Sequence, residues 1–414
     1  METTISLVNL KSKLPPKFQK YASFGIFPKL IFLPFALGFI ALTLLLRPFV
    51  VIKFFKVNQW RIGHLLVEVE IVRLNALEAS KTKKHYVIYY FPERRVANEY
   101  VVQMWKRVLP IISGSWGWLL YTLASNTNVK TLIVSPKIRD TAGLTAIYPT
   151  NLRFNQGEIE VGQEFLRSVN CQNHKFVCLM VRDSAYLKTI RTNKNFEFYK
   201  YRDSNISTYL QAAETLTEMG YTVFRMGQIV ANPIESANPK IIDYATNGMR
   251  TEFLDVYLGA NCKFCISTGT GFDNIPQIFR RPLIYLNIVG FFEDLIVNPF
   301  LFYPKIYKDS ISQKPLSLKE IADRGIQSEV HDSKIETSGT IVEDLDAIEI
   351  NNAVLEMIAK VEGSFVSSSE DELRIQKVRT IIRTHPSLQT FPNYGNIEGE
   401  FASCFLSRYP NFLD

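Results

Sequence analysis

The sequence predicts an α/β fold with two doubly wound, Rossmann-like domains that face a cleft, preceded by a basic and apolar N-terminal segment. The chain has 414 residues, which leaves room for two domains and an appendage at roughly 100–200 residues per domain. Its residues are 47% hydrophobic and 21% charged, a composition that can bury a core and excludes disordered and fibrous classes. Short apolar runs alternate with amphipathic segments, as strand–helix units require.

The positive charge of the chain is concentrated at its N-terminus. The whole chain carries a net charge of +7, but residues 1–61 hold nine Lys and Arg residues against Glu2 alone, a net of +8. The remaining residues therefore carry a net charge of −1, which argues against nucleic acid as a partner. Clustered Lys and Arg beside apolar residues instead favour an anionic membrane surface.

Residues 30–46 are 17 consecutive residues without a charge, close to the lower limit of about 17–25 residues for a spanning helix. A cleaved signal peptide is disfavoured, because Arg47 and large apolar residues follow where small residues should mark the cleavage site. A spanning helix, a monotopic segment bent at Pro34 and Gly38, and a buried core helix remain as alternatives. Because positive charge flanks the run on both sides, we expect residues 1–57 to associate with the cytoplasmic face of the inner or plasma membrane.

The first domain is expected over residues 58–165. Its periodicity predicts, in order, a helix, a strand, a helix and a strand over residues 65–79, 85–91, 97–109 and 131–134. Residues 137–162 contain Gly, Pro and Asn with little periodicity, so we place the domain boundary near their end.

The second domain is expected over residues 166–362. Its predicted strands cover residues 175–181, 221–225, 263–267 and 282–287, and its predicted helices cover residues 207–219, 251–260, 274–280 and 347–360. Gly220 suits the position after a helix C-terminus. Strands and helices in this alternation indicate a doubly wound sheet. Residues 363–414 are expected to form a partly helical tail that includes a polar loop at residues 367–372.

The cysteines and paired carboxylates indicate neither disulfides nor metal. The five cysteines are an odd number scattered along the chain, and Cys262 and Cys265 form one CxxC without the second pair of a zinc site. A reducing compartment fits this usage. Asp344 and Asp346 lie in a polar stretch, where we expect them to be solvated. We therefore predict no metal and no cofactor.

The strongest local signal is Ser-Thr-Gly-Thr-Gly-Phe-Asp at residues 267–273, between a predicted strand and a predicted helix. Glycine allows positive φ and close backbone approach, and a helix N-terminus offers N–H groups to an anion. Thr268, Gly269, Thr270 and Gly271 are thus candidates to hold a diphosphate, the alternative being a tight turn without a ligand. The turn is neither a Walker A motif nor GxGxxG, so triphosphate hydrolysis and NAD binding lack support.

Two arginines, Arg182 and Arg225, stand at the ends of predicted strands in the same domain. Ligands of open α/β sheets bind beyond the carboxyl ends of the strands, and arginine grips phosphate with two hydrogen bonds. Salt-bridged surface arginines are the alternative, for instance Arg182 with Asp183. Tyr244 is a weaker candidate for stacking on a base, since a buried tyrosine with a satisfied hydroxyl is the commoner case.

A candidate base lies at the start of the first predicted helix. In Arg-Ile-Gly-His at residues 61–64, His64 follows a glycine and, if it faces the cleft, can take a proton from a sugar hydroxyl, because imidazole titrates near neutral pH. A capping or surface histidine is the alternative. Asp183 is the second candidate base, although its first expected task is to orient an arginine.

Several short motifs, taken in their order and spacing, resemble one family. They are Arg-Ile-Gly-His-Leu at 61–65, Val-Arg-Asp at 181–183, Gly-Tyr-Thr-Val-Phe-Arg-Met-Gly at 220–227, Asp-Tyr-Ala at 243–245 and Ser-Thr-Gly-Thr-Gly at 267–271. Over residues 58–360 the chain resembles a family of bacterial glycosyltransferases found with surface-polysaccharide and O-antigen biosynthesis genes.

The resemblance implies a GT-B architecture, in which the first domain handles the acceptor, the second binds the nucleotide-sugar donor, and a metal is usually not required. It implies that Arg182, Arg225 and the backbone of residues 268–271 bind the donor diphosphate, and that His64 activates the acceptor. The expected function is transfer of a sugar from a nucleotide-diphosphate sugar to a glycan or lipid-linked acceptor. The alternatives are a nucleotide-sugar epimerase or hydrolase, and a non-catalytic membrane scaffold of a polysaccharide assembly complex.

Overall fold

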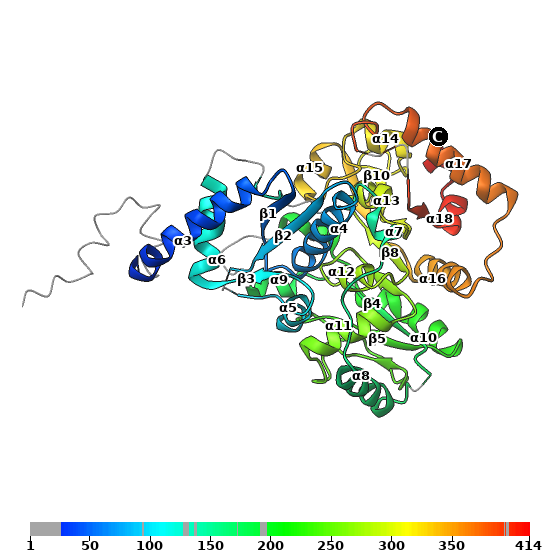
Figure 1. The fold of residues 1–414 in the computed structure, drawn as a ribbon. Helices are drawn as coiled ribbons and strands as arrows, with labels where there is room; N and C mark the ends of the chain where they lie inside the picture. The colour runs from blue at the N-terminus through cyan, green and yellow to red at the C-terminus, as the bar shows by residue number, and fades with distance from the viewer. Residues whose placement is uncertain are drawn as a thin grey trace, which may run out of the picture. The chain divides into compact units, whose positions relative to one another are not determined.

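The computed structural model describes residues 26–92, 95–126, 132–135, 139–171, 173–190, 197–392, 394 and 397–414 (Figure 1). Residues 1–25, which carry four of the nine N-terminal basic residues, lie outside the described residues. The chain forms two compact units. Unit 1 is Met1–Ala97 with Trp105–Ile138, and unit 2 is Asn98–Met104 with Arg139–Asp414.

Unit 1 is built on a parallel sheet in the order β1-β2-β3. Ile133 makes a parallel bridge to Phe54 of β1, and because β2 occupies one edge of β1, this bridge lies on the other edge. Its helices and strands, with the helix α5 shared with unit 2, are α3 (Ile26–Leu45), β1 (Val50–Lys56), the π-helical turn η1 (His64–Glu68), α4 (Val69–Ala79), β2 (Lys84–Tyr90), α5 (Glu99–Lys106), β3 (Ile111–Ile112) and α6 (Gly114–Asn126).

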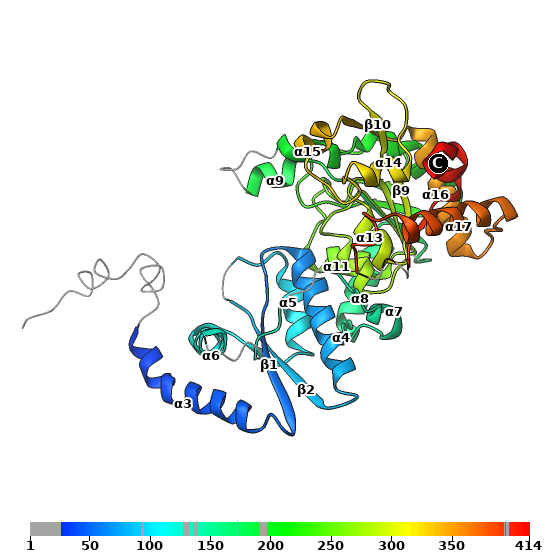
Figure 2. The ribbon, with the colours of Figure 1, turned by 90° about the horizontal axis from the view of Figure 1, so that it is seen from above.

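The strand β1 corrects the expected extent of the membrane segment, which we placed over residues 1–57. Phe54 and Phe55 are both fully buried, and successive strand residues point to opposite faces of a sheet. Phe54 belongs to a cluster with α3 and α6, while the ring of Phe55 lies edge-on to Tyr89 at 6.0 Å. Figure 2 shows α6 and α4 on opposite sides of β1 and β2. Residues 50–56 are therefore a strand of the sheet whose Phe54 and Phe55 reach the core on opposite faces.

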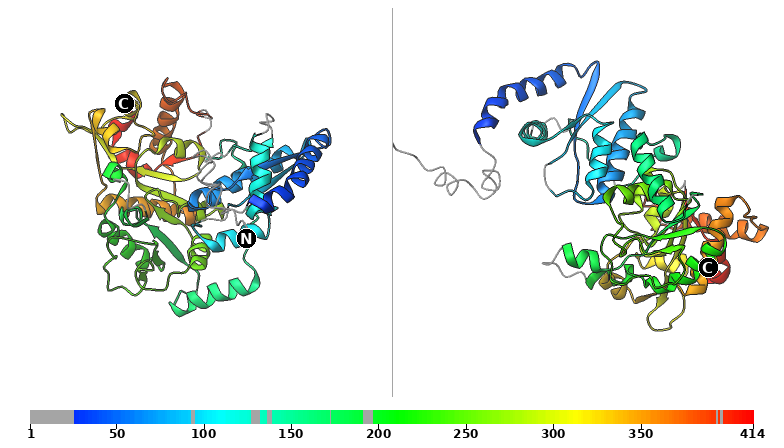
Figure 3. Two further views of the ribbon diagram at one scale, coloured as in Figure 1. Left: turned by 90° about the vertical axis from the view of Figure 1, so that its left-hand side faces the viewer. Right: turned by 90° about the horizontal axis from the view of Figure 1, so that it is seen from below.

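Helix α3 covers most of the uncharged run at residues 30–46. Ala36, Ile40 and Thr43 recur at helical spacing and are buried, where Ala36 and Ile40 pack with Leu119 and Leu120 of α6. Figure 3 shows α3 and α6 side by side. One face of α3 is thus part of the core of unit 1. Within the part of the chain that the structure describes, no helix is both long enough and apolar enough to cross a membrane.

Unit 2 contains a seven-stranded parallel sheet in the order β12-β9-β8-β7-β4-β5-β6. The predicted strands correspond to β4 (Phe176–Met180), β5 (Thr222–Arg225), β7 (Cys265–Ser267) and β8 (Leu283–Ile288), so these predictions are confirmed. The six strands β4 to β9 stand in the order 3-2-1-4-5-6 by their place in the chain, as in doubly wound nucleotide-binding sheets. The strand order reverses between β4 and β7.

The other elements of unit 2 surround this sheet. They are α7 (Leu144–Ile147), α8 (Gln156–Ser168), α9 (Ala185–Ile190), η3 (Glu197–Arg202), η4 (Ile206–Tyr209), α10 (Leu210–Glu218), β6 (Ile241–Ile242), α11 (Glu252–Asn261), α12 (Asn274–Ile278), α13 (Phe292–Val297), β9 (Leu301–Pro304), β10 (Ile306–Asp309), α14 (Leu318–Asp323), α15 (Asp332–Thr337), β11 (Thr340–Glu343), α16 (Ala347–Glu362), α17 (Ser369–Thr384), β12 (Glu400–Phe401), α18 (Ser403–Arg408) and η5 (Pro410–Leu413).

The C-terminal region is part of the core of unit 2 rather than a tail. Strand β12 pairs with β9, and Phe401, Phe405 and Phe412 are buried together. The expected polar loop at residues 367–372 is the start of α17, where Ser368 caps the helix in a capping box. Burial of three phenylalanines explains why this region joins unit 2.

Residues 139–165 also lie in unit 2, although we placed the domain boundary near residue 165. Helix α8 begins at a capping box of Asn155 and Glu158. At Gly162 a Cβ would lie 2.1 Å from Cζ of Tyr257 on α11. The helix α8 can therefore approach α11 this closely only because residue 162 has no side chain.

The variant Gly162→Ala is expected to lower the free energy of unfolding by about 1–3 kcal/mol, because the new methyl group overlaps the ring of Tyr257. Urea denaturation measures the change. The control is Gly157→Ala on the same helix, where the added Cβ has its nearest neighbour at 3.6 Å. Equal stability of the two variants would contradict the close approach.

Candidate functional site

The reversal of strand order in unit 2 brings together two segments that we singled out in the sequence. Arg182 follows β4 and Thr268 follows β7, and the Arg182 N–H donates to Thr268 Oγ1 at 2.8 Å. The Thr268 N–H in turn donates to the Met180 carbonyl at 3.2 Å. In open α/β sheets the crevice at such a reversal, beyond the carboxyl ends of the strands, is where ligands bind. Arg182 and Thr268 thus mark the candidate site of unit 2.

Three cations lie at this site: Arg182, Arg202 and Lys305. Arg182 forms an ion pair with Asp203, and Arg202 donates to the Gly269 carbonyl at 3.0 Å. The Lys305 amino group donates to the Asp203 carbonyl at 2.7 Å and to Asp344 at 2.5 Å. The segment that carries Arg202 and Asp203 is thereby linked to the carboxyl ends of β4, β7 and β9.

Two cations of this cluster, Arg182 and Lys305, are buried, and each is paired with a carboxylate. Burial, together with the neighbouring charge of Arg202, lowers the pKa of Arg182 to about 10, and burial lowers the pKa of Lys305. Both shifts mean that the positive forms lack solvation that they would have in water. A phosphate bound here would share Arg182 and Lys305 with the carboxylates of Asp203 and Asp344, and arginine binds phosphate with two parallel hydrogen bonds.

The sequence analysis missed Arg202 and Lys305. The rule that selected Arg182, a cation just after an apolar run that predicts a strand, also applies to Lys305. Lys305 comes shortly after the apolar run Phe-Leu-Phe-Tyr at residues 300–303, which forms most of β9. Arg202 lies in η3, where no strand end signals it. Asp344, expected to be solvated, pairs with Lys305, and Asp346 caps helix α16.

The glycine-rich turn after β7 is more closed than the sequence suggested. Its backbone N–H groups at Gly269 and Thr270 already donate to Ser267 Oγ and to Asp273, at 3.2 and 2.5 Å, and the Phe272 N–H donates to Thr270 Oγ1 at 3.2 Å. Asp273 is buried and stands in the place expected for a diphosphate. Gly269 has a φ of +84°, a backbone conformation that favours glycine at this position. The place predicted for a diphosphate, beside the backbone of residues 268–271, is occupied by the Asp273 carboxylate.

Arg225 and Asp183 have structural partners. The Arg225 guanidinium is buried and donates to the Asn232 carbonyl at 2.8 Å and to Asp243 at 3.4 Å, which fastens the segment between β5 and β6. The two carboxylate oxygens of Asp183 accept the backbone N–H groups of Ala185 and Ala231 at 2.9 and 2.8 Å. Both side chains therefore hold loops at the edge of the site; Arg225 is buried, and Asp183 is half-buried.

Tyr244 is fully buried, so its ring is not available to a base. Its hydroxyl accepts the Thr251 N–H at 3.0 Å and lies 3.3 Å from Asp255. Asp255 in turn accepts a hydrogen bond from Arg250 at 2.5 Å. The alternative that we stated for Tyr244, a buried tyrosine with a satisfied hydroxyl, describes this position.

The candidate base of unit 1 has a partner that the sequence analysis did not single out. His64 begins η1, and its Nδ1 lies 2.6 Å from Oε1 of Glu68, one turn further on. Glu68 is buried and His64 is partly exposed. In the tautomer that carries its proton on Nδ1, the ring donates to the Glu68 carboxylate and Nε2 keeps its lone pair. This is the arrangement of a base with an orienting carboxylate.

The position of His64 in unit 1 matches that of Arg182 in unit 2. The loop that leads to His64 follows β1, and β1 lies between β2 and the bridge at Ile133, so the strand order also reverses there. Single π-helical turns such as η1 are frequent at functional sites. Both units therefore carry candidate residues at the same topological position.

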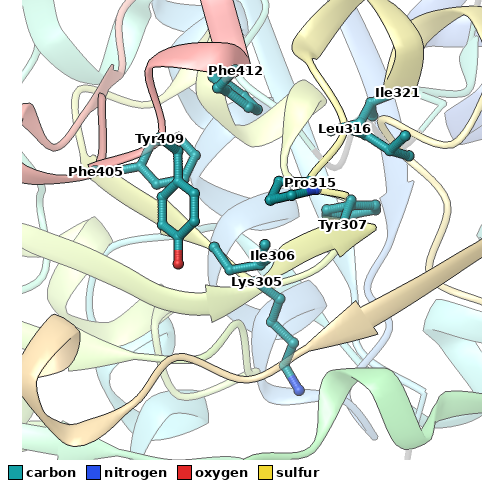
Figure 4. Close-up of a pocket in the computed structure, with 9 residues that line it drawn as sticks. All are labelled: Lys305, Ile306, Tyr307, Pro315, Leu316, Ile321, Phe405, Tyr409 and Phe412. Atoms are coloured by element: carbon teal, nitrogen blue, oxygen red, sulfur yellow. The ribbon is translucent and has the colours of Figure 1, made fainter. Parts of the chain in front are cut away.

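A cavity of about 10 Å³ lies beside Lys305 (Figure 4), at the limit of what one water molecule needs. The amino group of Lys305 points away from the aromatic side chains at the C-terminus in this view. The cavity is lined by Lys305, Ile306, Tyr307, Pro315, Leu316, Ile321, Phe405, Tyr409 and Phe412. It is too small for a substrate.

No three His, Cys, Asp or Glu side chains among the described residues are placed to hold a metal ion. The cysteines Cys171, Cys178, Cys262, Cys265 and Cys404 are free thiols, in line with the expectation that they form no disulfide framework.

No protein-family model matches the chain, and no curated protein matches it. Among solved structures, the ADP-heptose LPS heptosyltransferase II of E. coli is similar at 13% identity and a TM-score of 0.33, over 56% of this chain and 84% of that one. A glycosyl transferase family 9 protein from Veillonella parvula is similar at 10% identity and a TM-score of 0.42, over 75% of this chain and 97% of that one.

Burial of Asp273 makes the stability of the protein depend on pH. Burial raises the pKa of Asp273 to about 6, so between about pH 4 and pH 6 the folded state holds a proton that the unfolded state has lost. The free energy of unfolding is expected to fall as the pH rises through this window, by roughly 1–3 kcal/mol. Burial raises the pKa of Asp255 to about 6 as well, which adds to the slope.

The variant Asp273→Asn is expected to show a shallower fall, measured by urea denaturation at intervals from pH 4 to pH 7. The control is Glu372→Gln, which removes an exposed carboxylate on α17 and should keep the slope of the unmodified protein. A slope unchanged in Asp273→Asn would show that this carboxyl does not hold a proton in the folded state.

Proposed function

We propose that this chain is a metal-independent glycosyltransferase of the GT-B type, which moves a sugar from a nucleotide-diphosphate sugar to a glycan or lipid-linked acceptor in surface-polysaccharide biosynthesis. One observation carries the proposal: both units have a parallel sheet whose strand order reverses, with three cations at the reversal in unit 2 and a histidine–carboxylate pair at the reversal in unit 1. Such reversals are binding crevices.

The cations of unit 2 match the charge that develops on the donor. When the bond between the anomeric carbon and the diphosphate oxygen breaks, its electron pair stays on that oxygen, and negative charge builds on the leaving group. Arg182, Arg202 and Lys305 are held in place before the reaction by Asp203, Gly269 and Asp344. Positive groups that are already oriented stabilise developing charge without a reorganisation cost.

Because these cations take the place of a metal ion in the proposed mechanism, turnover of the donor is expected to survive chelation with EDTA.

The histidine of unit 1 matches the task of the acceptor site. An acceptor hydroxyl attacks the anomeric carbon as it loses its proton, and Nε2 of His64 is placed to take that proton. The Glu68 carboxylate orients the ring through Nδ1 and stabilises the imidazolium that forms. We further propose that the protein works at the cytoplasmic face of the inner or plasma membrane, where its acceptor would be held.

The first prediction from the proposed function concerns the nucleotide-sugar donor. A thermal-shift panel with UDP, GDP, ADP, CDP and CMP is expected to raise the melting temperature by several degrees for one diphosphate, because a ligand that binds only the folded state stabilises it. Arg182→Ala should abolish that shift, since it removes the arginine at the reversal. The control is Arg167→Ala, an exposed arginine at the end of α8, before β4 begins.

The thermal-shift panel distinguishes a donor site from a scaffold, and an assay without acceptor tests for a hydrolase. A shift that Arg182→Ala removes and Arg167→Ala keeps supports the donor site. No shift with any nucleotide at millimolar concentration contradicts it and favours a scaffold. Release of the nucleotide from its sugar at the full rate without an acceptor would make the protein a hydrolase.

The second prediction concerns the base. With the donor chosen by the panel, His64→Ala is expected to lower kcat by about 10²–10⁴-fold, the usual contribution of a general base, while the nucleotide-induced thermal shift stays unchanged. Glu68→Gln should lower kcat less, because the amide carbonyl can still accept from Nδ1 without the charge. Undiminished turnover of His64→Ala would refute the proposed base.

A further inference from the structure

The outward face of helix α3 is apolar to an unusual degree. Of its side chains, Phe35 is 68% exposed and Leu45 is 73% exposed, and Phe49 just beyond the helix is 78% exposed. Phe32, Leu37 and Leu42 are also exposed. Monomeric soluble proteins rarely expose apolar side chains in one contiguous patch of this kind, and such patches mark interaction sites.

Phe35, Leu42 and Leu45 form one stripe, whereas the ring of Phe32 lies edge-on to Trp116 of α6. Phe35, Leu42 and Leu45 lie at spacings of seven and three residues, which places them on one side of an α-helix. Ala36 and Ile40, which pack with α6, lie on the opposite side. The stripe therefore faces away from the core of unit 1, and Figure 3 shows α3 next to α6 in two views.

The charges around the stripe select an anionic surface. No Asp or Glu occurs from residue 3 to residue 67, and helix α6 carries no charged residue. Arg47 and Lys56, both exposed, follow the stripe in the chain. Lysine and arginine gain energy from anionic lipid headgroups while an apolar face enters the region below them. A lipid bilayer with anionic headgroups therefore fits this surface in both apolarity and charge.

The packing of α3 decides how the helix meets the bilayer. A helix that crosses a bilayer by itself is surrounded by lipid, but one side of α3 is covered by α6, Leu119 and Leu120 among its contacts. The polar side chain on the covered side, Thr43, donates its hydroxyl hydrogen to the Ile40 carbonyl at 2.7 Å. Only the outward stripe is open to lipid.

We propose that α3 lies flat in one leaflet of an anionic bilayer, with Phe35, Leu42, Leu45 and Phe49 below the headgroups and α6 holding the helix to unit 1. The proposal deepens the proposed function, because it names the membrane surface on which the enzyme would meet a lipid-linked acceptor. It depends on the surface of unit 1 alone, so the nucleotide thermal shift in unit 2 reports on the proposed function separately.

The test is co-sedimentation of the full chain with vesicles of phosphatidylcholine containing roughly 30% phosphatidylglycerol, whose headgroups supply the negative surface charge. The triple variant Phe35→Gln, Leu42→Gln, Leu45→Gln is expected to bind at least 100-fold more weakly, since each buried apolar side chain is worth about tenfold. The control is Ile348→Gln, Val366→Gln, Leu373→Gln, which changes three exposed apolar residues of unit 2 and should bind like the unmodified chain.

Two further measurements separate the alternatives. Alkaline carbonate is expected to release the bound chain, as it does for a helix in one leaflet; resistance to release would show a spanning segment and overturn the flat arrangement. If the triple variant binds vesicles unchanged but turns a dimer into a monomer in light scattering, the stripe is covered by a second copy, and the proposal fails. A far-ultraviolet circular dichroism spectrum and a urea unfolding midpoint equal to those of the unmodified chain show that the triple variant is folded.

Discussion

The parallel pairing of the strands in the main sheet of each unit is the constraint on which the rest of the structure depends. In unit 2 seven strands are mutually parallel, so their carboxyl ends meet at one edge, and each connection must cross the sheet through a helix or a long segment. Where the order reverses, between β4 and β7, the connections leave in opposite directions and open a crevice. Arg182 and Thr268 stand there because each is the first or second residue after a strand.

Burial determines which polar groups remain available at that edge. Arg225 and Arg182 follow neighbouring strands, but Arg225 is covered by the segment that it holds, while Arg182 lies beside Arg202 and Lys305. A buried arginine must be paired, because the uncompensated charge would be costly. The pairing of Arg225 with Asn232 and Asp243 meets this need, as the pairing with Asp203 does for Arg182.

The hydrogen-bond partners of the buried carboxylates likewise distinguish their roles. Asp273 stabilises the turn at residues 267–273 by accepting from its N–H and hydroxyl groups, so the turn owes its shape to an internal anion. Glu68 has a different task, since its partner is the titratable ring of His64. A carboxylate that faces a histidine at the start of a helix can direct proton transfer, whereas one that faces backbone N–H groups stabilises a loop.

Local pattern determined much of the fold of unit 2. The runs at residues 175–181, 221–225, 263–267 and 282–287 are strands, because apolar runs bounded by turn residues have few other stable solutions. The apolar run at residues 30–46 is helical, but its length and composition did not distinguish lipid from protein as its neighbour. Short strands such as β6 and β12 have too few residues to show a periodic pattern in the sequence. Phe401 of β12 belongs to the core because β12 pairs with β9.

The sequence by itself determined that this is an α/β protein with a basic, apolar N-terminal region, and it placed Arg182 at a strand end and His64 at a helix start. Only the tertiary structure decided that Arg202 and Lys305 join Arg182, that Glu68 lies beside His64, and that Arg225, Asp183 and Tyr244 have hydrogen-bond partners within the chain. The physical reason is that period and spacing report on neighbours within one element, whereas burial and pairing depend on residues far apart in the chain, such as Arg182 and Lys305.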